Sequence, residues 1–124
     1  MTLHMSTDFE GNNPFEFILS EGENIARDNV VLISGQNLKA GTVIGRITAS
    51  GKWTLHNATA SDGSEVARAI LGRDCDAAIA DARAIAITRL AEVKGAMLIY
   101  KAAITAPQKT AAIAALATQF IIVR

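Results

Sequence analysis

The stretch LKAGTVIGRITASGKW, Leu38–Trp53, decides the predicted fold. Residues 42–48 form an apolar, largely β-branched run with one internal glycine, and residues 53–56 form a second short run. The Ser50–Gly51 pair between them is typical of a turn, so the stretch predicts two antiparallel strands joined by a hairpin. A glycine inside a strand usually marks a bulge or a close approach of other backbone. We therefore expect Gly45 to shape this strand.

Short strands and one late helix are predicted for the rest of the chain. The segment beginning Thr105-Ala-Pro-Gln108 has the pattern of a capping box, and proline is favourable in a first helical turn, so a helix is expected near residues 106–118. The alanine-rich segment 76–93 has helical propensity but also alternates with a period of two. The expected fold class is mainly β, with α+β as the alternative. Apolar runs predict further strands at residues 15–19, 29–33, 66–71, 83–90, 97–100 and 120–123.

The composition limits the classes of function. The 124 residues fit one domain. Half of them are apolar, which indicates either contact with another subunit or an alanine-rich core. The 12 basic and 12 acidic residues cancel, and this balance argues against binding nucleic acid through its phosphates. No apolar run approaches the ~18 residues that span a bilayer, so no membrane partner is expected.

The N-terminal part differs from the remainder. Residues 1–14 show no periodicity and are expected to form a flexible arm, followed by a single domain over residues 15–124. After Pro14, the side chains of Phe15, Phe17 and Leu19 alternate along a predicted strand. This strand is either the first strand of the domain or one that adds to another chain.

The opening stretch could be interpreted as a phosphate-binding loop, because of its glycines, or as part of a carrier domain, because of its lysine. Gly41, Gly45 and Gly51 lack the spacing of a phosphate-binding loop, and a strand follows them where such a loop needs a helix. Biotinyl and lipoyl carrier domains place a modified lysine at a hairpin tip, where Lys52 lies. The residue before that lysine is glycine here, in place of the usual methionine or aspartate.

Cys75 is the only cysteine, and it does not look like a nucleophile. Asp74 and Asp76 flank it and disfavour its thiolate. Together with Asp81 they could be taken for a metal site, but histidine ligands and the known spacings are missing. We expect no enzymatic activity, no cofactor, no metal and no small-molecule substrate.

Four stretches together resemble the lambda-type bacteriophage head decoration proteins. Their order and spacing match that family over nearly the whole of residues 15–124. The stretches are RDNVVLISGQNLKAGTVIGRITASGKW (27–53), SDGSEVARAIL (61–71) followed by DCDA (74–77), AEV (91–93) and AALATQFIIVR (114–124).

The resemblance implies a domain of the β-clip type that forms homotrimers. Such trimers bind the major capsid protein on the outside of the expanded phage head, at local threefold sites, and stabilise the head against the pressure of packaged DNA. The location implied is the virion surface, with the host cytoplasm during assembly. A small carrier or ligand-binding β domain is the alternative function.

The resemblance also suggests roles for individual residues. An N-terminal arm that binds the capsid would use Pro14, Phe15, Phe17 and Leu19. From their apolar character, we expect the contacts between subunits of the trimer to involve Trp53, Ile113, Leu116 and Phe120.

Overall fold

The hairpin predicted at the opening stretch forms in the computed structural model, which describes residues 13–124. Strand β4 (Val43–Arg46) pairs antiparallel with β5 (Trp53–Leu55), and Gly51 turns the chain between them with a φ of 74°. A Cβ atom on Gly45 would lie 2.8 Å from the Cα atom of Ser64. Of the two features expected at Gly45, a bulge or a close approach of other backbone, the structure shows the close approach.

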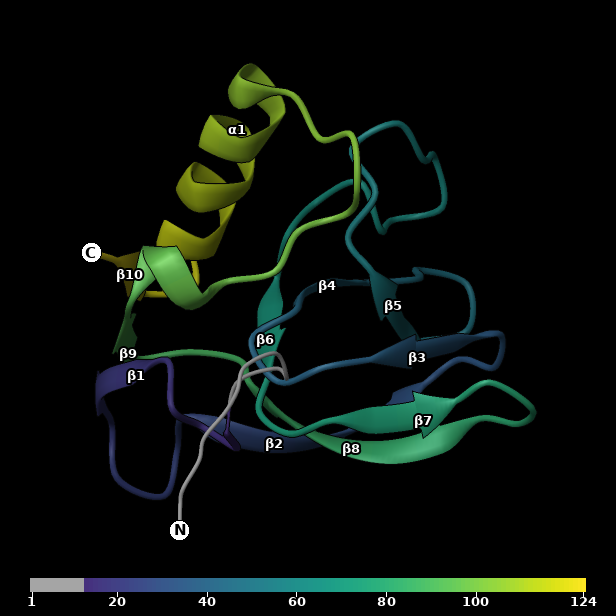
Figure 1. Cartoon of the computed structure of the whole chain (residues 1–124), viewed down its shortest axis with the longest axis horizontal. Coiled ribbons are helices and arrows are strands. Elements are labelled where there is room, and N and C mark those ends of the chain that lie inside the picture. Colours follow the sequence, from purple (N-terminus) through teal and green to yellow (C-terminus); the bar gives the residue numbers. More distant parts are fainter. Residues whose placement is uncertain (1–12) are drawn as a thin grey trace, which may run out of the picture.

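A closed barrel forms the larger part of the molecule (Figure 1). Its longest ladder pairs the six-residue strands β2 (Arg27–Leu32) and β8 (Ala82–Ile87) in antiparallel register. Strand β2 also pairs in parallel with β5, but only at Leu32 and Trp53. A two-stranded sheet lies beside the barrel. The barrel order is β2 (Arg27–Leu32), β5, β4, β6 (Ala69–Leu71) and β8 (Ala82–Ile87), and the small sheet pairs β3 (Gln36–Leu38) with β7 (Cys75–Ala77).

A second sheet and the helix make up the other part. The central strand of this sheet is β9 (Ala91–Val93). It pairs antiparallel with β1 (Ile18–Glu21) and parallel with β10 (Ile121–Val123), and α1 (Ala106–Ala117) precedes β10 in the chain (Figure 1). Thr105 and Gln108 form the predicted capping box at the start of the helix, which is therefore confirmed. The elements are β1 (Ile18–Glu21), β9 (Ala91–Val93), the 3-10 turn Gly95–Met97, α1 (Ala106–Ala117) and β10 (Ile121–Val123).

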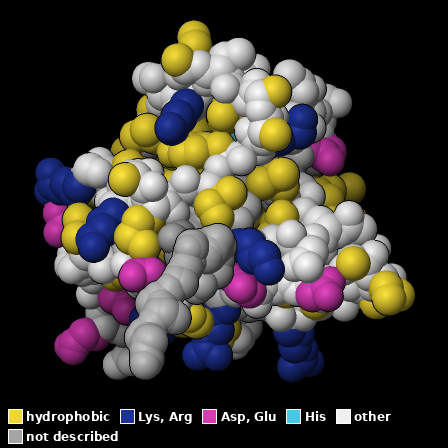
Figure 2. Space-filling model, viewed as in Figure 1, with side chains coloured by type: hydrophobic (Ala, Val, Ile, Leu, Met, Phe, Trp, Pro, Cys, Tyr) yellow, Lys and Arg dark blue, Asp and Glu magenta, His cyan; other side chains and the backbone are white. Residues whose placement is uncertain are grey.

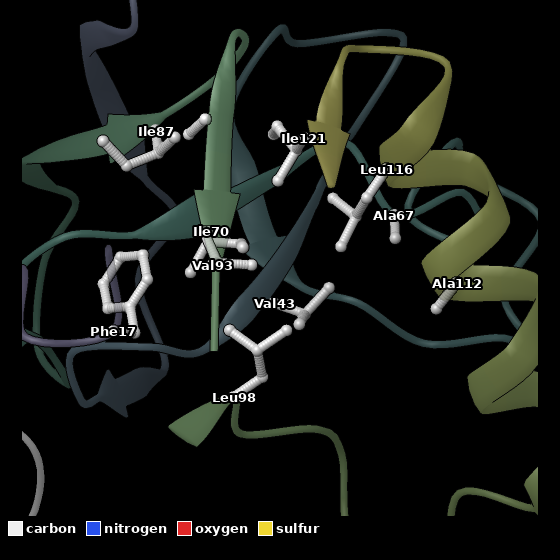
Figure 3. Packing of buried hydrophobic residues seen from close by; sticks show 11 residues of the cluster. Phe17, Val43, Ala67, Ile70, Ile87, Val93, Leu98, Ala112, Leu116 and Ile121 are labelled. Carbon is white, nitrogen blue, oxygen red and sulfur yellow. The ribbon is translucent and has the colours of Figure 1, made fainter. Parts of the chain in front are cut away.

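Two groups of buried side chains hold the fold together. One fills the barrel and includes Leu32, Ile44 and Leu71. The other joins the barrel to the helix and the second sheet, and Figure 3 shows its side chains converging from these elements. Both groups consist mainly of alanine, valine, isoleucine and leucine, so the alanine-rich core that the composition indicated is present.

The mainly β class with one C-terminal helix is confirmed, but several predicted strands are wrong in detail. Residues 14–17 form a turn, and the strand begins only at Ile18. The predicted strand at 97–100 is a 3-10 turn followed by a single bridge from Ile99 to Thr42. The strand predicted to reach Leu90 ends at Ile87, and Leu90 has a positive φ of 56°.

Candidate interaction surfaces

The first two predicted capsid-binding residues begin the described part of the chain. Pro14 is exposed. Phe15 adopts a φ of 58°, and its amide donates to the carbonyl of Gly72 at 2.8 Å. The guanidinium of Arg27 lies 3.7 Å from the centre of its ring, a cation–π contact. Phe15 is thus fixed against the barrel, with only part of its ring free.

Phe17 and Leu19 do not share a face. Phe17 is completely buried in the group of side chains that joins the barrel to the second sheet. The interpretation of Phe17 as a capsid-binding residue is therefore wrong in this fold, because the turn at 14–17 breaks the period-two pattern that suggested it. Leu19 lies on the edge strand β1 with 48% of its surface exposed, so it is available to a partner.

The four predicted trimer-contact residues also differ in how far they are exposed. Leu116 is completely buried between α1 and the second sheet, so assigning it to a subunit contact is wrong. Trp53 and Ile113 are half-buried, and Trp53 packs against the barrel core. Phe120 lies just beyond the helix and is 66% exposed, which leaves most of its ring free for a contact.

Phe120 belongs to a larger apolar surface, which we call the apolar edge: Ile25, Leu90, Phe120 and Ile122. Leu90, Phe120 and Ile122 line one shallow hollow on the second sheet. Ile25 lies next to Leu90, because both side chains approach Gly22 within 3.5 Å of where its Cβ would be. All four are partly or largely exposed.

A hollow with a volume of about 800 Å³ lies on the barrel next to the apolar edge. Val31 and Trp53 contribute apolar atoms to it, and four cationic side chains surround them. We call this surface the basic groove and define it by Val31, Arg46, Lys52, Trp53, Arg68 and Arg89. The groove was not predicted from the sequence, because only the fold of the barrel brings Arg68 and Arg89 next to Arg46 and Lys52 of the hairpin.

Two of the four cations in the groove have carboxylate partners, and two have none. Lys52 pairs with Asp81 at 2.6 Å, and Arg89 pairs with Asp28, which lowers the pKa of that carboxyl. Within residues 13–124, no carboxylate contacts the guanidinium of Arg46 or Arg68. The groove therefore presents excess positive charge together with the apolar side chains of Val31 and Trp53.

The hairpin lysine does not stand free at a tip. Its ion pair with Asp81 ties the loop before β5 to the segment before β8, where Asp81 also accepts from the amide of Ser34. These two contacts lower the pKa of Asp81, so it stays charged as the partner of Lys52. A carrier lysine needs free access, which this arrangement restricts.

The residues around Cys75 take part in backbone contacts. Asp74 accepts from the amide of Ala40, and Asp76 accepts from that of Ala78. Burial, together with the charge of Asp76, raises the pKa of the Cys75 thiol, so its thiolate is disfavoured. Among residues 13–124, no three histidine, cysteine or acidic side chains lie close enough together to hold a metal ion. Over the same residues, no helix has the length and hydropathy to cross a membrane.

His56 is a buried polar residue between the barrel and the helix. It is 2% exposed, and its Nε2 atom lies 3.1 Å from the carbonyl oxygen of Glu65. Nε2–H donates to that carbonyl in the neutral ring, and Nδ1 has no partner among the described residues. Burial lowers the pKa of His56, so the folded chain holds it neutral.

We expect the free energy of unfolding to decrease as the pH falls from 7 to 5. The unfolded chain binds a proton at His56 below its ordinary pKa of about 6.5, whereas the folded chain resists protonation, so acid favours unfolding. Urea unfolding at pH 7.5 and pH 5.5 measures the change. His56→Gln should remove most of the difference, and an unchanged difference in that variant would contradict the assignment.

A family model described as bacteriophage lambda head decoration protein D matches residues 8–121. Among individually curated proteins, none matches the chain. The family model covers nearly the whole chain, including the barrel, the helix and the second sheet as far as Ile121, the first residue of β10. The chain belongs to the bacteriophage lambda head decoration protein family.

Proposed function

We propose that this protein decorates a phage head as a homotrimer, binds the outer surface of the expanded shell at local threefold sites and stabilises it against the pressure of packaged DNA. Family membership over residues 8–121 carries the proposal. Its role is structural, without catalysis or a cofactor, and its main partners are the major capsid protein and other copies of itself. It resides on the outside of the virion, after assembly in the host cytoplasm.

The distribution of apolar surface supports a protein that works in an assembly. Nine large apolar residues within residues 13–124 expose 37% or more of their surface. Single exposed side chains are common in monomers. Here, however, four of the nine gather at the apolar edge, and Ile79 is 97% exposed in the β7–β8 turn. Figure 2 shows hydrophobic side chains at that projecting turn and below α1.

The N-terminal arm is proposed to bind the capsid. Residues 1–12 of the arm lie outside the described residues. Pro14 and Leu19 are exposed, and within residues 13–124 β1 pairs on one side only, with β9. An edge strand of this kind accepts an extended segment of a partner through backbone hydrogen bonds. Three arms in a trimer would bind more tightly than one, because the second and third contacts are intramolecular.

Deleting residues 1–12 tests this role of the arm. We expect the truncated protein to fold and to keep the oligomeric state of the full chain, since the deletion leaves intact the core that residues 13–124 form. Its co-sedimentation with expanded heads should be lost at concentrations that saturate them with the full chain. The deletion stops before Phe17, because removing that buried side chain would damage the fold itself.

A truncated protein that saturates expanded heads at the same concentration as the full chain would contradict the arm assignment. Leu19→Ala tests the contribution of the edge strand to binding apart from that of the arm, because it removes an exposed side chain and leaves residues 1–12 unchanged. We expect this variant to bind more weakly than the full chain but to retain measurable binding.

A further inference from the structure

The basic groove and the apolar edge meet along one line of the molecule. Arg89 and Gln119 line the groove, and the residues that follow them, Leu90 and Phe120, line the hollow of the apolar edge. These two segments are hydrogen-bonded to each other, since the amide of Leu90 donates to the carbonyl of Gln119 at 3.3 Å. Two surfaces of different character therefore share a border.

The backbone at this border is held in an unfavourable conformation. Leu90 has a φ of 56° and Phe120 a φ of 61°, a region that bulky side chains rarely adopt. Such a conformation is unfavourable and persists where the surrounding structure enforces it, commonly at functional sites. Here it places two large apolar side chains on the surface, where burial within the single chain brings them little stabilisation.

The two surfaces are complementary in charge. Arg46 and Arg68 in the groove have no carboxylate partner within residues 13–124. Beside the apolar edge, the β1–β2 turn that carries Ile25 also carries Glu23, which is exposed and has no cationic partner among the same residues. Each surface therefore leaves unpaired the charge that the other could neutralise.

Their apolar groups are complementary as well. The groove is lined by Val31, which is partly exposed, and by the half-buried Trp53. Across an interface these would face Ile25 and Phe120 of another copy. An apolar centre with a charged rim is the usual anatomy of a protein–protein interface.

We infer that the apolar edge of one copy packs into the basic groove of the next, so that the trimer closes through three identical head-to-tail contacts. The inference rests on the proposed homotrimer and specifies its interface. A head-to-tail contact uses two different surfaces of each copy and closes into a ring when the rotation between copies allows it. Two surfaces that share a border suit this arrangement, because each copy then fills a wedge whose flanks meet near the ring axis.

Two variants of the full chain test the two surfaces one at a time. Arg46→Glu combined with Arg68→Glu reverses the charge of the groove, and Phe120→Asn removes the main apolar side chain of the edge. Asparagine tolerates a positive φ better than phenylalanine does, so the second variant should keep its melting temperature. We expect each variant to raise the Kd of self-association by about 30-fold or more, as loss of a central interface residue does.

Light scattering after size-exclusion chromatography reads out the assembly. The wild-type chain should have a mass about three times 13.1 kDa, and each variant alone should shift to 13.1 kDa. Mixed in equal amounts, the variants should yield a species of about twice 13.1 kDa, because the intact groove of one meets the intact edge of the other. The mixture cannot close a ring, since each pair has only one intact contact.

Two matched controls are outside the residues that line the two surfaces. Lys101→Glu reverses an exposed charge before α1, and Ile79→Asn removes an exposed apolar side chain in the β7–β8 turn, far from β9 and β10 (Figure 1). Both should remain trimers. If both interface variants remain trimers, the inferred interface is wrong while the proposed function stands. A monomeric wild-type chain would contradict the proposed trimer itself.

Discussion

Replacing Phe17 by alanine is expected to lower the free energy of unfolding by about 3–5 kcal/mol, the usual cost of removing a buried phenylalanine ring. The ring is completely buried and packs with side chains of the barrel and of the second sheet, such as Ile70 and Val93 (Figure 3). The cavity left behind would loosen the joint between these two parts. Urea unfolding followed by circular dichroism measures the loss.

Leu19→Ala is the matched control for this measurement. Leu19 lies two residues away and is 48% exposed, so its truncation should change the free energy of unfolding by less than about 1 kcal/mol. Equal effects of the two substitutions would mean that Phe17 is not a core residue. A stable Phe17→Ala protein that fails to bind heads would restore the interpretation of Phe17 as a capsid-binding residue.

Gly63→Ala should destabilise the chain by about 4 kcal/mol, through backbone strain and a steric clash together. Gly63 has a φ of 110°, which an alanine adopts only with strain. Its added Cβ would lie 2.6 Å from the carbonyl oxygen of Arg46 and 2.9 Å from the amide nitrogen of Thr48. Both are backbone atoms at the end of β4, so the barrel hairpin would have to move. Thermal unfolding measures this effect.

Gly35→Ala isolates the conformational part of that effect. Gly35 has a comparable φ of 101°, but nothing lies within 4 Å of where its Cβ would be. Its substitution should cost only about 1–2 kcal/mol, from strain alone. If Gly63→Ala proved no more destabilising than Gly35→Ala, the close packing of the 62–64 turn against β4 would be wrong.

Features that depend on neighbouring residues were predictable from the sequence. The Ser50–Gly51 turn and the capping box at Thr105 each follow from local geometry, and each is present. The helix bounds, Ala106–Ala117, agree with the predicted 106–118 for the same reason. Local hydrogen bonds and steric limits act within a few residues, so their sequence patterns are specific.

Features that depend on distant residues were not predictable. Strand β7 was not predicted, because its three residues become a strand only by pairing with β3, almost 40 positions earlier. Likewise, the alternation of Phe15, Phe17 and Leu19 could not reveal the turn at 14–17, in which the Phe15 amide bonds to Gly72. Strands of three residues carry too little periodicity to be found without their partners.

The candidate interaction surfaces divide in the same way. An apolar residue near the end of a helix can belong to the core or to an interface, and only the fold distinguishes Leu116, which is buried, from Phe120, which is exposed. The basic groove left no sequence signal at all, since Arg46 and Arg68 are isolated cations next to apolar strands. Their proximity arises from the pairing of β4 with β6.

Co-sedimentation of the full chain with expanded and unexpanded heads of its phage tests the central claim most directly. The proposed function predicts saturable binding to expanded heads, with three copies bound at each site, and no binding to unexpanded heads. Equal binding to both forms, or no binding to expanded heads, would contradict the claim that this protein decorates and stabilises the mature shell.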